Sequence, residues 1–187
     1  MKVILASSSP RREQILKEII RDFEIIPPDI DERVDFSNPL EAVKELSFQK
    51  ASAVYSKHPD CLIISADTVV VFNGVVFGKP KFAVNAFEML SKLSGNTHLV
   101  YTAVAVMRNG KADVFADISQ VTFRSLTENQ IKDYIASGSP FDKAGGYGVQ
   151  DSDFVQKIVG SYSNVMGLPK ERLLEYFRSI GEEDVNL

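Results

Sequence analysis

Cysteine is scarce in this chain of 187 residues, which contains only Cys61. A single cysteine cannot form an internal disulfide. Cys61 also begins the apolar segment CLIIS, and a thiol in such a segment is more typical of a core residue than of a nucleophile. We therefore expect neither an internal disulfide nor redox chemistry.

Long apolar runs and an excess of positive charge are also absent. No run approaches the roughly 18 apolar residues of a membrane-spanning helix, and the chain starts with a short strand rather than a signal peptide. The formal net charge of −4 argues against extended binding to a nucleic-acid backbone, which needs a basic face. We expect a cytoplasmic protein without a membrane or nucleic-acid partner, in which any polyanionic ligand is small and is bound by a local cluster of cations.

The apolar pattern predicts one α/β domain over residues 1–187 with a mixed sheet and a frayed tail at about 181–187. Asn-Gly pairs at 73–74 and 109–110 predict hairpin turns. Strands are expected in KVILAS, FEIIPP, CLIISADTVVVF, THLVYTAVAVM and ADVFADISQVTF. Helices are expected from Pro10, over 39–56, 83–93 and 127–137, and from Pro169, where Leu173, Leu174, Phe177 and Ile180 face inward.

The segment SSSPRREQIL places two arginines at the expected start of the first helix. Ser9 followed by Pro10 is typical of an N-cap and a first helical turn. That turn has free N–H groups and partial positive charge, so Arg11 and Arg12 are slightly unfavourable there unless an anion binds. The pair indicates a phosphate site, or alternatively two arginines in solvent or paired with surface carboxylates.

Two charged residues lie where apolar residues are expected. Asp67 interrupts LIISADTVVVF, so its carboxylate must be satisfied by a cation, a metal or hydrogen bonds, unless Asp67 only caps a strand end at the surface. Lys50 falls on the apolar stripe of its helix between Leu46 and Val54, so its stem points inward. The alternative is a lysine that extends its ammonium group back to solvent.

Two loops provide weaker candidates. Lys79 follows a hairpin between Gly78 and Pro80, where the backbone can approach a ligand, although a turn lysine usually has no such role. Glu32 lies in the acidic segment DIDER, which would ordinarily be solvated. In combination, four cations could neutralise three phosphates while two carboxylates hold a divalent ion and orient a water, as phosphoryl chemistry on a nucleotide requires.

Ordered motifs across nearly the whole chain resemble the Maf family of nucleoside triphosphate pyrophosphatases, which shares a superfamily with the inosine triphosphatases. The matching segments are ASSSPRR, DER, QKA, ADT, GKP, KLSG, YTAVAV, VTF, KAGGYGVQ and IVGSYSNVMGLP. Two loops depart from the family pattern, at SSSPRR and at the double glycine of AGGYG. The resemblance implies an elongated α/β fold with a central mixed sheet, surrounding helices and a cleft between two lobes.

The resemblance also implies hydrolysis of a nucleoside triphosphate between its α and β phosphates, which releases a monophosphate and pyrophosphate. Asp67 would accept a proton, and Glu32 and Asp67 would hold a divalent cation, either Mg²⁺, Mn²⁺ or Co²⁺. The substrate would be held by Arg11, Arg12, Lys50 and Lys79.

Substrate preference is implied by Arg12, Thr68 and Gln150, which resemble the branch that prefers dTTP and UTP. A branch acting on 7-methyl-GTP differs there, and that substrate stays an alternative, as does a nucleotide-binding regulator of septum formation and cell division. Two carboxylates beside a triphosphate favour the enzyme, because without a metal they would repel the ligand. Whether the chain forms a homodimer is left open.

Overall fold

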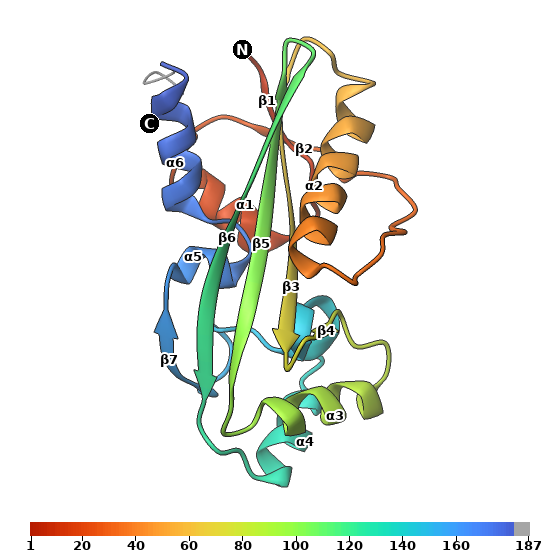
Figure 1. The fold of residues 1–187 in the computed structure, drawn as a ribbon, viewed down its shortest axis with the longest axis vertical. Coiled ribbons are helices and arrows are strands. Elements are labelled where there is room, and N and C mark those ends of the chain that lie inside the picture. Colours follow the sequence, from red (N-terminus) through yellow and green to blue (C-terminus); the bar gives the residue numbers. More distant parts are fainter. Residues whose placement is uncertain (182–187) are drawn as a thin grey trace.

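The computed structural model describes residues 1–181 as an elongated α/β fold built on one mixed sheet (Figure 1). The strand order is β2-β1-β3-β5-β6-β7, and β4 also pairs with β3. β1 is parallel to β2 and β3, whereas the other pairs are antiparallel. The seven strands are β1 Val3–Leu5, β2 Glu24–Ile25, β3 Leu62–Phe72, β4 Val75–Phe77, β5 Thr97–Arg108, β6 Lys111–Phe123 and β7 Val155–Val159.

The predicted α/β fold class with a central mixed sheet is confirmed. The predicted frayed tail lies outside the described residues, apart from Gly181. Both Asn-Gly pairs form the predicted hairpin turns, in which Asn73 and Asn109 have φ angles of 50° and 49°. Each is followed by a glycine with positive φ, as a type I′ turn requires.

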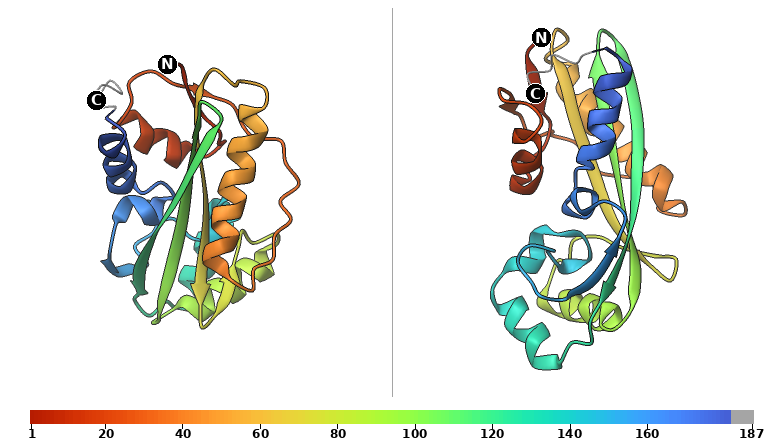
Figure 2. Two further views of the ribbon diagram at one scale, coloured as in Figure 1. Left: turned by 45° about the horizontal axis from the view of Figure 1, so that its top comes forward. Right: turned by 90° about the vertical axis from the view of Figure 1, so that its left-hand side faces the viewer.

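Helices cover the two faces of the sheet unequally (Figure 2). In the half nearer the N-terminus, α1 (Pro10–Lys17), α5 (Tyr162–Met166) and α6 (Lys170–Ser179) lie on one face, and α2 (Pro39–Tyr55) covers the other. The opposite half carries α3 (Ala83–Leu93), α4 (Glu128–Ala136) and the 3-10 turns η1 (Ser139–Asp142) and η2 (Ala144–Gly146). No helix within residues 1–181 is long and apolar enough to span a membrane.

Alternation along β3 separates the core into layers. Leu62, Ile64 and Ala66 face α1 and α6, whereas Ile63 faces α2. Cys61 is buried in the α2 layer, which confirms that it is a core residue. The predicted C-terminal helix buries Leu173 and Phe177, while Leu174 and Ile180 are only partly buried.

Two short elements are not predicted from the sequence. Strand β7 is an edge strand of five residues with no fully buried side chain, so it lacks a regular apolar alternation. Helix α5 is also five residues long, too short to show a helical period. Both lie in the segment that brings Asn164 and Gly167 to the middle of the sheet.

Candidate active site

The candidate site lies at a gap in the edge of the sheet. On one side of β3, β1 pairs with Leu62–Ile64 and β4 pairs with Val70–Phe72. Within the described part of the chain, no strand covers residues 65–69 on that side, although β5 pairs with them on the other. Side chains from both faces of the sheet therefore reach one pocket, into which Asp67 and Thr68 project.

A lysine bridges two carboxylates on the α2 side of this gap. Lys50 Nζ lies 2.5 Å from Asp67 Oδ1 and 2.8 Å from Glu32 Oε1. Lys50 and Asp67 are both 8% exposed, while about half of the Glu32 side chain is exposed. Asp67 lies in the middle of β3, so the alternative of a surface strand cap is wrong. The alternative of a solvent-exposed Lys50 is wrong too, because its ammonium group is buried against these carboxylates.

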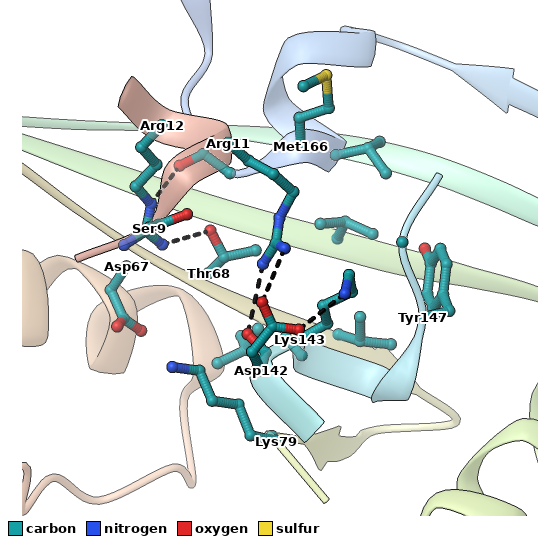
Figure 3. A pocket seen from close by; sticks show the side chains of 18 of the residues that line it. Ser9, Arg11, Arg12, Asp67, Thr68, Lys79, Asp142, Lys143, Tyr147 and Met166 are labelled. Atoms are coloured by element: carbon teal, nitrogen blue, oxygen red, sulfur yellow. Dashed lines mark hydrogen bonds and ion pairs between the residues drawn. The ribbon is translucent and has the colours of Figure 1, made fainter. Parts of the chain in front are cut away.

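The charges in the pocket keep Glu32 ionised. Partial burial would by itself raise the pKa of Glu32, but the hydrogen bond and charge of Lys50, together with Lys79 and Arg12, hold that pKa below its ordinary value. Among residues 1–181, Lys79 makes no ion pair, and its side chain extends along the pocket wall below Asp67 (Figure 3). Lys79 is therefore a cation available to a ligand.

Arg12 is held by protein groups from three segments. Its Nε donates to Gly167 O at 2.8 Å, its Nη2 to Thr68 Oγ1 at 3.1 Å and its Nη1 to Ser7 Oγ at 3.4 Å. Gly167 has a φ of 109°, which glycine adopts without strain and other residues do not. Burial lowers the pKa of Arg12, and the nearby Asp67 charge opposes this shift. Arg12 is thus a pre-oriented cation rather than a freely moving surface residue.

Arg11 links the two halves of the molecule across the pocket. Its Nη1 lies 3.1 Å from Asp142 Oδ2, and its Nη2 donates to Asp142 O at 3.3 Å (Figure 3). Asp142 also contacts Lys143 at 2.7 Å, and the two cations lower its pKa against the opposite effect of burial. In this structure Arg11 is therefore paired with a carboxylate, as in the alternative to a phosphate site, but the partner is 131 positions away and lines the same pocket. The phosphate role of Arg11 stays a prediction.

Two residues implicated in base selection are placed differently. Thr68 lines the pocket beside Arg12. Gln150 is exposed and is not among the lining residues, which at this loop are Gly148 and Val149. In this structure the pocket therefore brings together Arg11, Arg12, Glu32, Lys50, Asp67, Thr68 and Lys79, but not Gln150. A role for Gln150 stays a prediction.

The Ser9 side chain does not cap helix α1, although Ser9 is the N-cap residue by position. Its hydroxyl makes no hydrogen bond to the first turn, so the N–H groups there are not satisfied by that side chain. Ser9 lines the pocket instead. This leaves the helix start facing the cavity together with its two arginines.

Sequence reasoning missed the residues that form the far wall of the pocket. Lys143 is 8% exposed and contacts Asp142 and Asp151, and Tyr147 is buried in the same wall. The Tyr147 hydroxyl lies 2.7 Å from His98 Nε2, and burial lowers the pKa of His98 to about 4. The available signal was a lysine and a tyrosine within the glycine-rich segment KAGGYG.

Comparison with known proteins shows the family of this chain. A family model described as Maf-like protein matches residues 2–180. The chain belongs to the Maf-like family. It is 48% identical to a dTTP/UTP pyrophosphatase of Carboxydothermus hydrogenoformans, with 97% of this chain and 100% of the relative covered. A protein of the same name from Bacillus cereus is 43% identical, with 100% and 97% covered.

The fold of this Maf-like chain also resembles a solved structure. The Ham1 protein of Staphylococcus aureus superposes with a TM-score of 0.57, covering 97% of this chain and 100% of that protein. Because the sequences are only 14% identical, this likeness concerns the fold alone.

The acidic residues suit a cation that is shared with a ligand. No group of three or more histidine, cysteine, aspartate or glutamate residues within residues 1–181 could hold a metal ion by itself. Asp67 and Glu32 do approach one Nζ atom from two sides, so their oxygens converge on one positive charge. Mg²⁺ is commonly held by one or two carboxylates together with substrate phosphates and water. The residues present fit that mode of binding.

Proposed function

We propose that this Maf-like protein hydrolyses dTTP and UTP between the α and β phosphates, releasing the monophosphate and pyrophosphate, and so removes these nucleotides from the cellular pool. The main support is the pocket itself, where two carboxylates converge on Lys50 while Arg11, Arg12 and Lys79 face the same cavity. Relatives named dTTP/UTP pyrophosphatase at 43 to 48% identity over nearly the whole chain support the choice of substrate.

In the proposed reaction the cations bind and orient the triphosphate. Arg12 is held in place before the substrate arrives, so little freedom is lost when it meets a phosphate oxygen. Arg11 exchanges Asp142 for the substrate, and Lys79 provides a further positive charge at the leaving pyrophosphate. The buried position of the Lys50–Asp67 pair keeps the Asp67 carboxylate in one orientation.

Asp67 accepts the proton of the attacking water in this proposal. Its carboxylate lies beside Lys50, and only one of its oxygens is occupied by that lysine in the structure. A divalent cation, either Mg²⁺, Mn²⁺ or Co²⁺, would be held by Asp67 and Glu32, and would supply charge neutralisation and a more acidic water. A cytoplasmic location stays a prediction, and a regulator of septum formation stays an alternative.

The test is product analysis with purified protein. dTTP, UTP, CTP, dATP, GTP and 7-methyl-GTP are each incubated with Mg²⁺, Mn²⁺ or Co²⁺, and monophosphate and pyrophosphate are separated by anion-exchange chromatography. We expect equal amounts of the two products from dTTP and UTP, much slower cleavage of the purines, and no turnover in excess chelator. Orthophosphate release, a preference for 7-methyl-GTP, or nucleotide binding without turnover would each contradict the proposal.

A further inference from the structure

A chain of hydrogen bonds runs from the pocket into the core through two threonines. Arg12 Nη2 donates to Thr68 Oγ1 at 3.1 Å, and Thr68 Oγ1 lies 3.0 Å from Thr102 Oγ1. Thr102 Oγ1 lies 2.9 Å from the backbone oxygen of Asn164. The strand pairing brings the threonines together, because Thr68 on β3 stands directly opposite Thr102 on β5.

The donor and the acceptor of each of these hydrogen bonds are fixed by the two terminal groups, which are Arg12 and the backbone oxygen of Asn164. A carbonyl oxygen cannot donate, so the Thr102 hydroxyl must give its only proton to Asn164. The proton between the two threonines must then come from Thr68. An arginine cannot accept, so Thr68 receives a hydrogen bond from Arg12 while it donates to Thr102. Thr68 therefore has no proton left for the pocket and presents only its second lone pair.

The interior end of the chain holds this direction firmly. Thr102 and Asn164 are both fully buried, so water cannot replace either partner. The Asn164 side-chain amide donates to Val100 O at 3.2 Å and to Ser119 Oγ at 2.9 Å, which ties α5 to β5 and β6. The backbone carbonyl of Asn164 also accepts a hydrogen bond from the Gly167 N–H at 3.0 Å, so Thr102 and Gly167 both donate to this oxygen.

Because the Thr68 hydroxyl can only accept a hydrogen bond from the pocket, it favours ligand groups that donate one. Phosphate oxygens are themselves acceptors, so the part of a nucleotide that meets Thr68 has to bring a hydrogen. Thymine and uracil carry such a hydrogen at N3, whereas cytosine has no hydrogen on N3. We propose that Thr102 is a positioning residue for base selection, which holds the Thr68 hydroxyl as an acceptor for the N3–H of thymine or uracil.

This inference rests on the proposed pyrophosphatase function and adds a residue that does not line the pocket. The first test uses the unmodified protein and compares UTP with 3-methyl-UTP, in which a methyl group replaces the N3 hydrogen. We expect kcat/KM to be about 10- to 100-fold lower for 3-methyl-UTP, as for the loss of one hydrogen bond at a site built to accept it. Equal kcat/KM for the two nucleotides would overturn the inference.

The second test changes Thr102 and leaves the pocket lining intact. T102V keeps the shape but removes the acceptor for the Thr68 proton, so Thr68 can turn its hydrogen toward the base. We expect the ratio of kcat/KM for UTP over CTP to fall about tenfold or more, and the penalty for 3-methyl-UTP to shrink to about threefold or less. T102S retains the hydroxyl and should restore both ratios.

The outcomes separate this inference from the function on which it rests. Absence of dTTP and UTP hydrolysis by the unmodified protein would overturn both. Normal UTP hydrolysis with unchanged ratios in T102V would overturn the role of Thr102 alone. A merely structural Thr102 would lower activity on every nucleotide by the same factor, in proportion to the folded fraction measured by thermal unfolding. If T102V does not fold, equal kcat/KM for UTP and 3-methyl-UTP would still overturn the inference.

Discussion

Replacement of Asp67 by asparagine tests stability and chemistry at one position. The substitution keeps the shape of the side chain and removes its negative charge and its capacity to take a proton. In the structure Asp67 Oδ1 lies 2.5 Å from Lys50 Nζ, and both residues are 8% exposed. The variant therefore leaves a buried ammonium group with one charged partner fewer.

The expected loss of stability follows from what remains around Lys50. Removing one partner of a buried ion pair typically costs about 3 to 5 kcal/mol. Here Glu32 stays 2.8 Å from the same ammonium group, and the asparagine oxygen can still accept a hydrogen bond. We expect a smaller loss of about 1 to 3 kcal/mol in the free energy of unfolding. At about 2 to 4 °C per kcal/mol, the melting temperature should fall by about 2 to 12 °C.

The expected loss of activity is much larger than this loss of stability. If Asp67 accepts the proton, kcat for dTTP should fall by about 10² to 10⁴ at a temperature where the variant is fully folded. Glu32→Gln is the matched control, because it removes the other carboxylate that contacts Lys50. Since about half of the Glu32 side chain is exposed, that variant should melt within a few degrees of the unmodified protein.

The assay measures pyrophosphate release, thermal unfolding and dTTP affinity on the same preparations of both variants. Affinity without metal should be unchanged or improved in Asp67→Asn, because a negative charge beside the triphosphate is removed. A folded Asp67→Asn protein with kcat within about fivefold of the unmodified enzyme would refute Asp67 as the proton acceptor. A fall in activity that only tracks the unfolded fraction would assign Asp67 to structure.

Three further predictions concern two residues that line the pocket and His98, which contacts Tyr147 in the pocket wall. Arg12→Ala should lower kcat/KM for dTTP by a factor equivalent to about 1.5 to 3 kcal/mol, because a charge-assisted contact with the substrate is lost. An unchanged kcat/KM would show that Arg12 does not bind the substrate. Asp142→Asn removes the partly exposed ion pair between Asp142 and Arg11, so Arg11 is free to bind the substrate and the KM for dTTP should fall about two- to fivefold. A higher KM would mean that the Arg11–Asp142 ion pair holds the site open. Burial lowers the pKa of His98 from 6.5 to about 4. Between pH 6.5 and about pH 4 the unfolded chain therefore binds more protons than the folded chain. The free energy of unfolding should then fall by about 2 kcal/mol from pH 7 to pH 5. Urea unfolding should show this loss in the unmodified protein and a much smaller one in His98→Leu, and equal pH dependence would disprove the effect.

The elements that could be predicted from the sequence are those with local causes. The Asn-Gly turns need only two residues with positive φ. The start of α4 also depends on four neighbouring residues, since Thr127 and Gln130 form a capping box. Asp67 and Lys50 could be identified because each places a charge among apolar residues of its own strand or helix. A charged residue within an apolar segment can be recognised from the few residues on either side of it in the sequence.

The remaining features depend on contacts between distant segments. Arg11 and Asp142 are 131 residues apart, and nothing in the segment SPFD distinguishes Asp142 from an ordinary turn residue. Thr68 and Thr102 meet only because β3 and β5 pair in one register. A role for Gln150 is implied only by the family resemblance, and in this structure its side chain is exposed outside the pocket. No local pattern in a single sequence predicts that Arg11 contacts Asp142 or that Thr68 contacts Thr102.

The position of the site follows from a property of strands and from the missing neighbour of β3. Adjacent residues on a strand point to opposite faces, so Asp67 faces α2 with Lys50, while Thr68 faces Arg12 and α5. In a fully paired sheet two such residues would be separated by the sheet itself. Between β1 and β4 the edge of β3 is open within the described residues, so one ligand can reach both. In the proposed function, proton transfer on one face and base selection on the other depend on two consecutive residues, and a single-residue insertion between them would put both side chains on the same face.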